Sequence, residues 1–440
     1  MIKQTKIMMT GLSLAAIMAL SGCTNTATPN NSEANMVTAY ANIAHANYND
    51  ALTDAKKLQL AIDAFVANPT EMTMENAKNA WLESRESYGQ TEIFRLANGP
   101  IDAEEGWVAE KYGALEGQLN AWPLDENMID YTINAKGAKT SGNIIDTKGA
   151  FNPGGEESTS VDVSTITVDA ITELNENGGD ANVASGYHAI EFLLWGQDQD
   201  YSNFLKDSIT NGALEAGQRP LTDFTKDKDA DRRKAYLQAA SEKIINDLTV
   251  IAQAWEKGDA TNYRAAILGK NSDASKNIAT EDAYKDIFAG MGVFIKSELA
   301  NERIAVAVLT PSEEDEHSCF SDNTHRDIVT NYQGFKNILM GTYNGVDYGV
   351  APIDAMNAAD KEEILKLMAK IETKIESIDN IAKTSRHFDY QIRPNDPQAK
   401  VIVKLKNELR KLGDKMVTVA GANGINLTID EVTDADETKL

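Results

Sequence analysis

The chain has 440 residues and a formal net charge of −25, because 67 acidic side chains outnumber 42 basic ones. Such an acidic surface repels nucleic acid and anionic lipid headgroups, which excludes both as direct partners. The length is sufficient for two domains of ordinary size, each with its own core.

The first residues have the pattern of an export signal. Two lysines precede a short apolar stretch at residues 7–20, which is too short to span a bilayer comfortably and is typical of a signal peptide. The Leu-Ser-Gly sequence that follows ends at Cys23 and is similar to a bacterial lipobox. We therefore predict a lipoprotein signal peptide over residues 1–23, with Cys23 as the lipidated residue.

Residues 24–35 are rich in Thr, Asn, Ala, Pro and Ser and are predicted to form a flexible tether. Thr24 directly after the cysteine favours sorting to the outer membrane, so we expect the chain to be exported, lipid-anchored there and facing the periplasm. The lipid is the only membrane contact that we expect. Once Cys23 is lipidated, Cys319 is the one cysteine left, and no intramolecular disulfide can form.

Helical periodicity dominates the rest of the chain, where apolar residues recur at three- and four-residue steps. The longest such stretches lie at residues 37–65, 229–257, 360–383 and 395–420, the last ending at Gly421. Residues 135–182 are instead polar and rich in glycine, and we expect a long excursion there with one short helix after Ser164. The pattern predicts a mainly α protein of two helical-bundle domains, residues 36–257 and 258–430, with an acidic tail at 431–440.

A predicted helix at residues 71–97 carries charged side chains on the face that should pack against the core. Five side chains at four- and three-residue steps share this stripe: Trp81, Arg85, Tyr88, Glu92 and Arg95. One interpretation is an internal Arg–Glu ion pair that fixes the helix register. The other is a carboxylate held by arginines and presented to a site at the centre of the bundle.

The most informative motif is a histidine and a carboxylate one helical turn apart. His188 and Glu191 stand at positions i and i+3 and therefore share a helix face. The apolar run at residues 192–195 is typical of a buried helix. Burying this pair is unfavourable unless a charge, a hydrogen bond or a metal compensates. We therefore interpret the pair as a candidate metal or ligand site, with core packing as the structural alternative.

The second half of the chain repeats this arrangement in a weaker form. A predicted helix that begins near Tyr284 has an apolar stripe that turns acidic at Glu298 and Glu302. A later helix begins close to His325. Each half therefore has an acidic helix end and a histidine near a helix start, which suggests an old duplication. Glu298, Glu302 and His325 form a second candidate group, for which a structural role is the alternative.

Mixed imidazole and carboxylate ligands suit iron, zinc or manganese. A ligating histidine usually has a carboxylate or carbonyl on its other nitrogen, so Glu191 is either a ligand or the group that orients His188. A zincin-type peptidase needs two histidines four residues apart, and none of the five histidines has that spacing.

Three segments resemble the imelysin-like proteins, and within them the iron-regulated protein A group: residues 81–102, 186–198 and 316–327. Gly186, His188 and Glu191 match the Gly-x-His-x-x-Glu motif of that family. The resemblance extends over residues 36–430 and implies two helical bundles related by duplication, with the motif facing a cavity near their interface. It also implies a link to iron uptake in bacterial envelopes, in a family that is also classed among the metallopeptidases.

We therefore expect an envelope lipoprotein that binds iron or an iron-containing ligand for iron acquisition, with zinc as the alternative metal and envelope iron-uptake proteins as partners. The expected binding groups are His188, Glu191 and Glu92, supported by Gly186, Arg85, Arg95, Tyr88 and Trp81. The two arginines would hold the carboxylates or meet an anionic ligand such as a chelate. We expect a binding protein rather than an enzyme; the alternatives are a metal-dependent endopeptidase and a non-catalytic scaffold.

Overall fold

The computed structural model describes residues 35–134, 136–198, 213–309 and 316–434. The predicted signal peptide, Cys23 and most of the tether lie outside this part of the chain. The described residues are mainly helical, as predicted, with two short β-hairpins. No helix among them combines the length and the apolar character that crossing a membrane requires.

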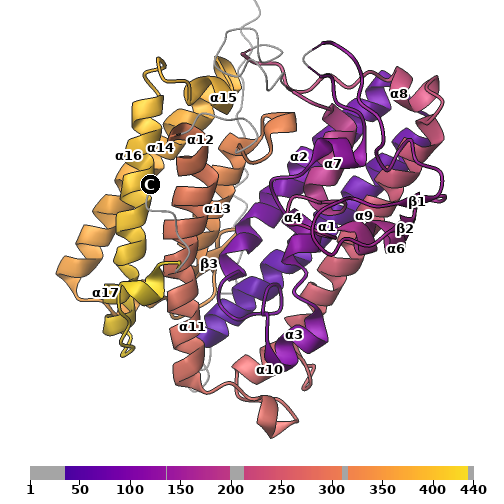
Figure 1. Cartoon of the computed structure of the whole chain (residues 1–440). Helices are drawn as coiled ribbons and strands as arrows, with labels where there is room; N and C mark the ends of the chain where they lie inside the picture. The colour runs from indigo at the N-terminus through magenta and orange to yellow at the C-terminus, as the bar shows by residue number, and fades with distance from the viewer. Residues whose placement is uncertain (1–34, 135, 199–212, 310–315, 435–440) are drawn as a thin grey trace, which may run out of the picture.

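Long helices of the first half pack side by side on one side of the molecule (Figure 1). They are α1 (Met36–Ala67), α2 (Glu71–Thr91), α7 (Gly186–Trp195) and α9 (Ala230–Ala254). The predicted apolar stripe of α1 is buried throughout, from Val37 to Phe65. Capping side chains set the starts of α1 and α2: the Asn35 side chain accepts a hydrogen bond from the Thr38 amide, and Thr70 forms a capping box with Thr73.

Helices of the second half gather on the other side (Figure 1). They are α11 (Thr280–Val293), η4 (Phe294–Ala305), α12 (Val306–Leu309), α13 (Thr324–Met340), α14 (Ala358–Thr384), α15 (Phe388–Gln391), α16 (Ala399–Asp414) and α17 (Met416–Ala422). The apolar stripe of α16 packs against η4 and α14. The duplication that would relate the two halves stays a prediction.

Short elements fill the connections between the long helices. The helical ones are α3 (Gly106–Tyr112), α4 (Glu116–Asn120), α5 (Glu126–Ile129), α6 (Val168–Leu174), α8 (Thr222–Thr225), α10 (Tyr263–Ile267), and the single turns η1 (Glu92–Phe94), η3 (Ala274–Lys276), η5 (Cys319–Ser321), η6 (Pro352–Ala355) and η7 (Asp430–Val432). The antiparallel strands are β1 (Ala150–Phe151) with β2 (Val161–Asp162), and β3 (Thr342–Tyr343) with β4 (Val346–Asp347).

The polar excursion has one short helix after Ser164, as expected, which is α6. A single side chain from α9 holds this region in place through hydrogen bonds. The Arg232 guanidinium donates hydrogen bonds to five backbone carbonyls, those of Ile144, Ile145, Thr147, Val163 and Ser164. The guanidinium has five N–H donors in a fixed planar arrangement. One arginine can therefore supply hydrogen bonds to loop carbonyls that a helix or sheet would otherwise supply.

The two halves meet where α2 packs against α13. Two glycines allow the close approach. A Cβ at Gly89 would lie 2.1 Å from Thr330 Oγ1, and one at Gly334 would lie 2.5 Å from the Gln90 carbonyl oxygen. Neither space admits a larger side chain. This contact places the buried stripe of α2 against the start of α13, where the candidate site forms.

Three helix expectations were wrong in detail. The helix predicted at 71–97 ends at Thr91, and Arg95 follows the single turn η1 in extended conformation. Gly421 lies inside α17 and does not end the helix; the stop is at Asn423, before Gly424 in the left-handed region with φ +84°. The region around Glu298 is a π-helix, whose wider turns shift the buried face, so that Arg303 is buried and Glu302 exposed.

Candidate functional site: a buried histidine pair

The first turn of α7 is fixed by a glycine. Gly186 has φ +86°, and a Cβ there would lie 2.6 Å from the Leu119 carbonyl oxygen of α4. Only glycine combines this backbone conformation with this close approach. The motif glycine therefore seats the helix start against α4, and all ten residues of α7 are buried.

Four side chains form an unbroken hydrogen-bonded series inside the molecule. Glu191 Oε2 lies 2.7 Å from His188 Nδ1, His188 Nε2 lies 3.0 Å from His317 Nε2, and His317 Nδ1 lies 2.7 Å from Asp327 Oδ2. All four residues are at most 1% exposed. The structure therefore brings His188 and Glu191 together, as their spacing predicted, and joins them to a second histidine 129 positions away.

Burial and hydrogen bonding determine where the protons lie in this series. Burial lowers the pKa of His317 to about 4 and, together with His317, holds that of His188 well below its ordinary value. Burial raises the pKa of Glu191 to about 8. For Asp327, burial would raise the pKa, but Arg85 and His317 outweigh it and hold the pKa well below the usual range.

With Asp327 ionised and both histidines neutral, one arrangement of hydrogens gives every contact a single donor. His317 Nδ1 donates to Asp327, His188 Nε2 donates to His317 Nε2, and protonated Glu191 donates to His188 Nδ1. The other Glu191 oxygen accepts hydrogen bonds from the Ser321 amide at 2.9 Å and its hydroxyl at 2.6 Å. Each imidazole thus has its Nδ1 held by a carboxyl group and its Nε2 turned toward the other ring.

An alternating chain of arginines and carboxylates begins at Asp327. Arg85 Nη2 lies 3.0 Å from Asp327 Oδ1 and 3.7 Å from Glu92 Oε1. Arg303 Nη2 then lies 2.9 Å from both Glu92 Oε2 and Glu298 Oε1. Arg95 Nη1 completes the series, 2.8 Å from Glu298 Oε1 and 3.3 Å from Glu116 Oε1. We refer to these seven residues, Asp327, Arg85, Glu92, Arg303, Glu298, Arg95 and Glu116, as the alternating chain.

The aromatic members of the predicted stripe enclose Arg85. Its guanidinium carbon lies 5.2 Å from the ring centroids of both Tyr88 and Tyr187 and 5.7 Å from that of Trp81. Trp81 Nε1 also donates a hydrogen bond to the Tyr187 carbonyl at 2.9 Å. These contacts hold the guanidinium in a dry position, where its interaction with Asp327 is strong.

Trp122 packs against both histidines and also lines a cavity. Its ring centroid is 4.8 Å from that of His188 and 5.8 Å from that of His317, both in edge-on geometry. The cavity that it lines has a volume of about 250 Å³, and its other lining residues include Arg95 and Glu298. We call it the inner cavity.

The remaining predicted residues lie outside the histidine series. Glu92 contacts arginines of the alternating chain, as does Glu298, whereas Glu302 is exposed at the inner cavity. His325 is separate, with Nδ1 3.0 Å from the Asp322 carbonyl oxygen and Nε2 3.8 Å from Asp379. The histidine of the second half that joins the site is instead His317.

Sequence reasoning missed His317, Asp327, Arg303 and Trp122. Two of them lie in the segment 316–327 that carries part of the family resemblance. A second histidine eight residues before His325 was the available signal. No helical spacing pointed to it, because His317 lies in the loop before η5.

A second set of buried carboxylates lies close to this site. Burial, followed by the charge of Asp389, raises the pKa of Glu316 well above its ordinary value, and burial raises that of Asp389 to about 7. Burial, followed by the neighbouring acids Asp198 and Asp389, raises the pKa of Asp322 in the same way. Glu316 Oε2 and Asp389 Oδ2 are buried without a hydrogen-bond partner. We call Glu316, Asp322 and Asp389 the acidic trio.

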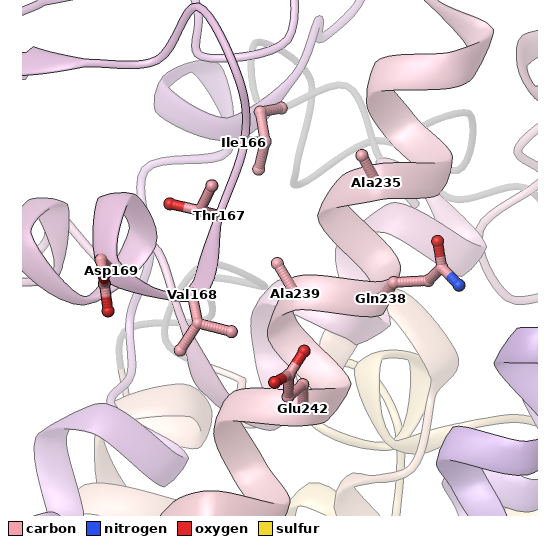
Figure 2. A pocket seen from close by; sticks show the side chains of 8 residues that line it. All are labelled: Ile166, Thr167, Val168, Asp169, Ala235, Gln238, Ala239 and Glu242. Atoms are coloured by element: carbon pink, nitrogen blue, oxygen red, sulfur yellow. The ribbon is translucent and has the colours of Figure 1, made fainter.

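The described residues contain no group of three or more His, Cys, Asp or Glu side chains arranged to hold a metal ion. The histidine pair instead offers two nitrogen atoms that converge. A separate pocket of about 420 Å³ lies between the start of α6 and α9, lined by Thr167, Ala239 and Glu242 among others (Figure 2). None of the candidate residues lines it.

Comparison with known proteins gives three findings. The family model of imelysin, named as a peptidase family (M75), matches residues 44–416. A protein of Synechococcus elongatus named iron-regulated protein A is 24% identical over 300 residues, which span 67% of this chain and 60% of the relative. A crystal structure described as an iron-regulated protein A precursor from Parabacteroides distasonis is similar with a TM-score of 0.53 and 18% identity, covering 89% of this chain and 97% of that one.

Proposed function

Because this chain belongs to the imelysin family, we propose that it is an envelope protein that binds iron, or an iron-containing ligand, for iron acquisition. The observation that carries the proposal is the pair of imidazole nitrogens, His188 Nε2 and His317 Nε2, that face each other 3.0 Å apart. A metal ion needs about 2.0–2.1 Å to each imidazole nitrogen. In this proposal the cation therefore replaces the hydrogen bond between the rings, and the rings move apart to admit it. Imidazole nitrogen is an accepted ligand of iron and of zinc.

The surroundings of the pair support ligation. Each ring has its Nδ1 on a carboxyl group, Glu191 or Asp327, and such contacts orient ligating histidines and raise their basicity. Burial keeps both rings neutral, which is the form that binds metal. In this proposal Glu191 orients His188 and is not itself a ligand.

Two nitrogens are fewer donors than a closed protein site provides. The remaining coordination positions of the cargo therefore go to water or to atoms of a chelating ligand. Arg85 and Arg95 do not meet that ligand in this proposal, because both guanidinium groups already contact carboxylates. An anionic chelate is therefore a poorer fit than a hydrated cation or a cationic complex.

A non-catalytic scaffold is the second candidate. The observation that favours it is that the four side chains of the series already satisfy one another's hydrogen bonds. A buried polar network of this kind can specify how two elements dock without binding anything. The metal-dependent endopeptidase is the third reading, and the same experiment tests it.

Iron titration of matched histidine variants tests the proposal. Protein is purified without chelator, and Fe²⁺ binding is measured anaerobically by calorimetry, with metal content measured by mass spectrometry. His188→Ala and His317→Ala should lose binding, and Glu191→Gln should weaken it about 10- to 100-fold. His325→Ala is the control, since this histidine is also largely buried but contacts a backbone carbonyl.

Unchanged iron binding in both pair variants, or none in the wild type, contradicts the proposal. Zinc in place of iron under the same conditions would favour the alternative metal. Chelator-sensitive cleavage of unfolded casein that both pair variants lack would support the endopeptidase.

The lipid anchor and the outer-membrane location remain part of this proposal. They depend on the lipobox-like sequence that ends at Cys23, which lies outside the described residues. Labelling with a radioactive fatty acid should mark the wild type and not Cys23→Ser, and membrane fractionation should place the label in the outer membrane.

A further inference from the structure

A cavity that adjoins the inner cavity is strongly acidic. It has a volume of about 850 Å³, and its lining includes seven carboxylates and one basic residue, Arg95. Over the whole chain the ratio is 67 acidic to 42 basic residues, so the excess in the cavity is more than the general acidity of the protein. We call this space the outer cavity. A cleft lined by one sign of charge concentrates ions of the opposite sign.

The single arginine does not neutralise this lining. Arg95 Nη1 contacts Glu298 at 2.8 Å and Glu116 at 3.3 Å, so of the seven lining carboxylates it pairs with Glu116 alone. Asp102 also lines the outer cavity, and its Oδ1 atom is buried with no hydrogen-bond partner. Burial raises the pKa of Asp102, Glu116, Glu176 and Asp286. Glu116 has Arg95 as a partner at 3.3 Å, but Asp102, Glu176 and Asp286 form no ion pair with the described residues, and a bound cation would stabilise their ionised forms.

The outer cavity leads toward the histidine pair. It shares Arg95, Glu116 and Glu176 with the inner cavity. The inner cavity in turn reaches Trp122, whose ring lies against both histidines. The outer cavity is therefore continuous in its lining with the inner cavity, and the Trp122 ring separates the inner cavity from the paired imidazoles.

We infer that the outer cavity holds hydrated metal cations, bound through their water shell, at the entrance to the histidine pair. This inference rests on the proposed function. No group of three described acidic or histidine side chains is arranged for direct metal ligation, so the carboxylates accept hydrogen bonds from coordinated water. A cation with six waters occupies roughly 200 Å³, at about 30 Å³ per water, which the outer cavity accommodates.

Cobalt(III) hexaammine is the probe, because it is a compact trivalent cation that does not exchange its ligands and cannot be ligated by histidine. Its binding is measured by calorimetry at low ionic strength, where screening is weak. The test variant combines Glu104→Gln, Glu105→Gln and Glu176→Gln, three changes in the cavity lining that leave the alternating chain intact. The control combines Glu71→Gln, Glu75→Gln and Glu83→Gln on the exposed face of α2, which removes the same charge.

Wild type, His188→Ala and the control should bind the probe alike. The cavity variant should bind it about 5- to 100-fold more weakly, since each exposed charge contributes a modest part of the attraction. Equal binding by the cavity variant and the control, or no binding by the wild type, overturns the inference. Iron binding at the histidines without hexaammine binding would refute this cavity site alone, whereas hexaammine binding without iron binding would refute the proposed function alone.

Discussion

The alternating chain and the acidic trio bury carboxylates in opposite ways. In the alternating chain every carboxylate has an arginine within 4 Å. Burial alone would raise the pKa of Glu298, but Arg95 and Arg303 outweigh it and lower the pKa to about 2. In the acidic trio, the one arginine contact within 4 Å among the described residues is Arg393, 3.9 Å from Asp389.

The difference lies in the partners and not in the degree of burial. Glu92 is 1% exposed and Asp389 2% exposed, yet the first is enclosed by guanidinium groups while the second has a pKa raised to about 7. A buried carboxylate held by two arginines, such as Glu298, is stable as an anion, and one with little compensating charge, such as Asp389, is more stable protonated. The two regions should therefore respond to mutation and to pH with opposite signs.

The largest effect on the free energy of unfolding is expected from removing Arg85, a member of the alternating chain. Arg85→Met keeps an unbranched apolar stem but leaves Asp327 and Glu92 buried with less compensation. Breaking a buried pair from one side costs about 3–5 kcal/mol, and we expect a loss of that size in the free energy of unfolding, measured by urea denaturation at pH 7.

Arg386→Met is the matched control for this change. Arg386 contacts Asp396 with two hydrogen bonds of 2.6 and 2.8 Å, but the two side chains are 24% and 15% exposed. Removing a solvated pair should cost about 1 kcal/mol or less. Equal losses in the two variants would show that burial does not set the strength of the alternating chain.

The acidic trio should respond in the opposite direction. Asp389 has a pKa of about 7 in the folded protein against 3.8 for an ordinary aspartate. The folded state therefore binds more protons between these values, and the contribution of this group to stability falls as pH rises from about 4 to about 7. Asp389→Asn removes the titration, so it should raise the free energy of unfolding at pH 8 by about 1–3 kcal/mol and change it little at pH 4.

Denaturation curves at the two pH values check this, with Glu298→Gln as the comparison. Glu298 contacts two arginines, so its loss should destabilise at pH 8 by about 1.5–3 kcal/mol. Destabilisation by both variants at pH 8 would mean that Asp389 has a stabilising partner as an anion, and the contrast between the regions would fail.

The features that could be predicted from the sequence are those that depend on helical periodicity. The buried stripe of α1 and the α7 contact between His188 and Glu191 follow from residues three and four positions apart. Contacts between distant segments could not be predicted in this way. Arg85 and Asp327 are 242 positions apart, and they meet because Gly89 and Gly334 let α2 and α13 approach closely. That Arg85 forms an ion pair with Asp327 is evident only once α2 and α13 are packed together.

The π-helix η4 is the second feature that could not be predicted from the sequence. Four-residue steps placed Glu298 and Glu302 on one face, which holds for an α-helix. In η4 the turns are wider, and the buried charged side chains are those of Lys296 and Arg303 and not that of Glu302. The composition of this segment does not indicate a π-helix, so Glu302 was assigned to the wrong face, whereas Glu298 does contact the buried arginines.

The smallest predicted effect on the free energy of unfolding tests the helical register of η4. It also tests whether the alternating chain excludes Glu302. Glu302 follows Glu298 by four positions but is exposed in the folded protein, where any interaction of its carboxylate is screened by water. Glu302→Gln should therefore change the free energy of unfolding by no more than about 1 kcal/mol, measured beside Glu298→Gln under the same conditions. If η4 were instead an α-helix with both carboxylates on the buried face, the two losses would be similar. A clear difference between neighbours of the same chemical type is expected because Glu298 contacts buried arginines whereas Glu302 is exposed.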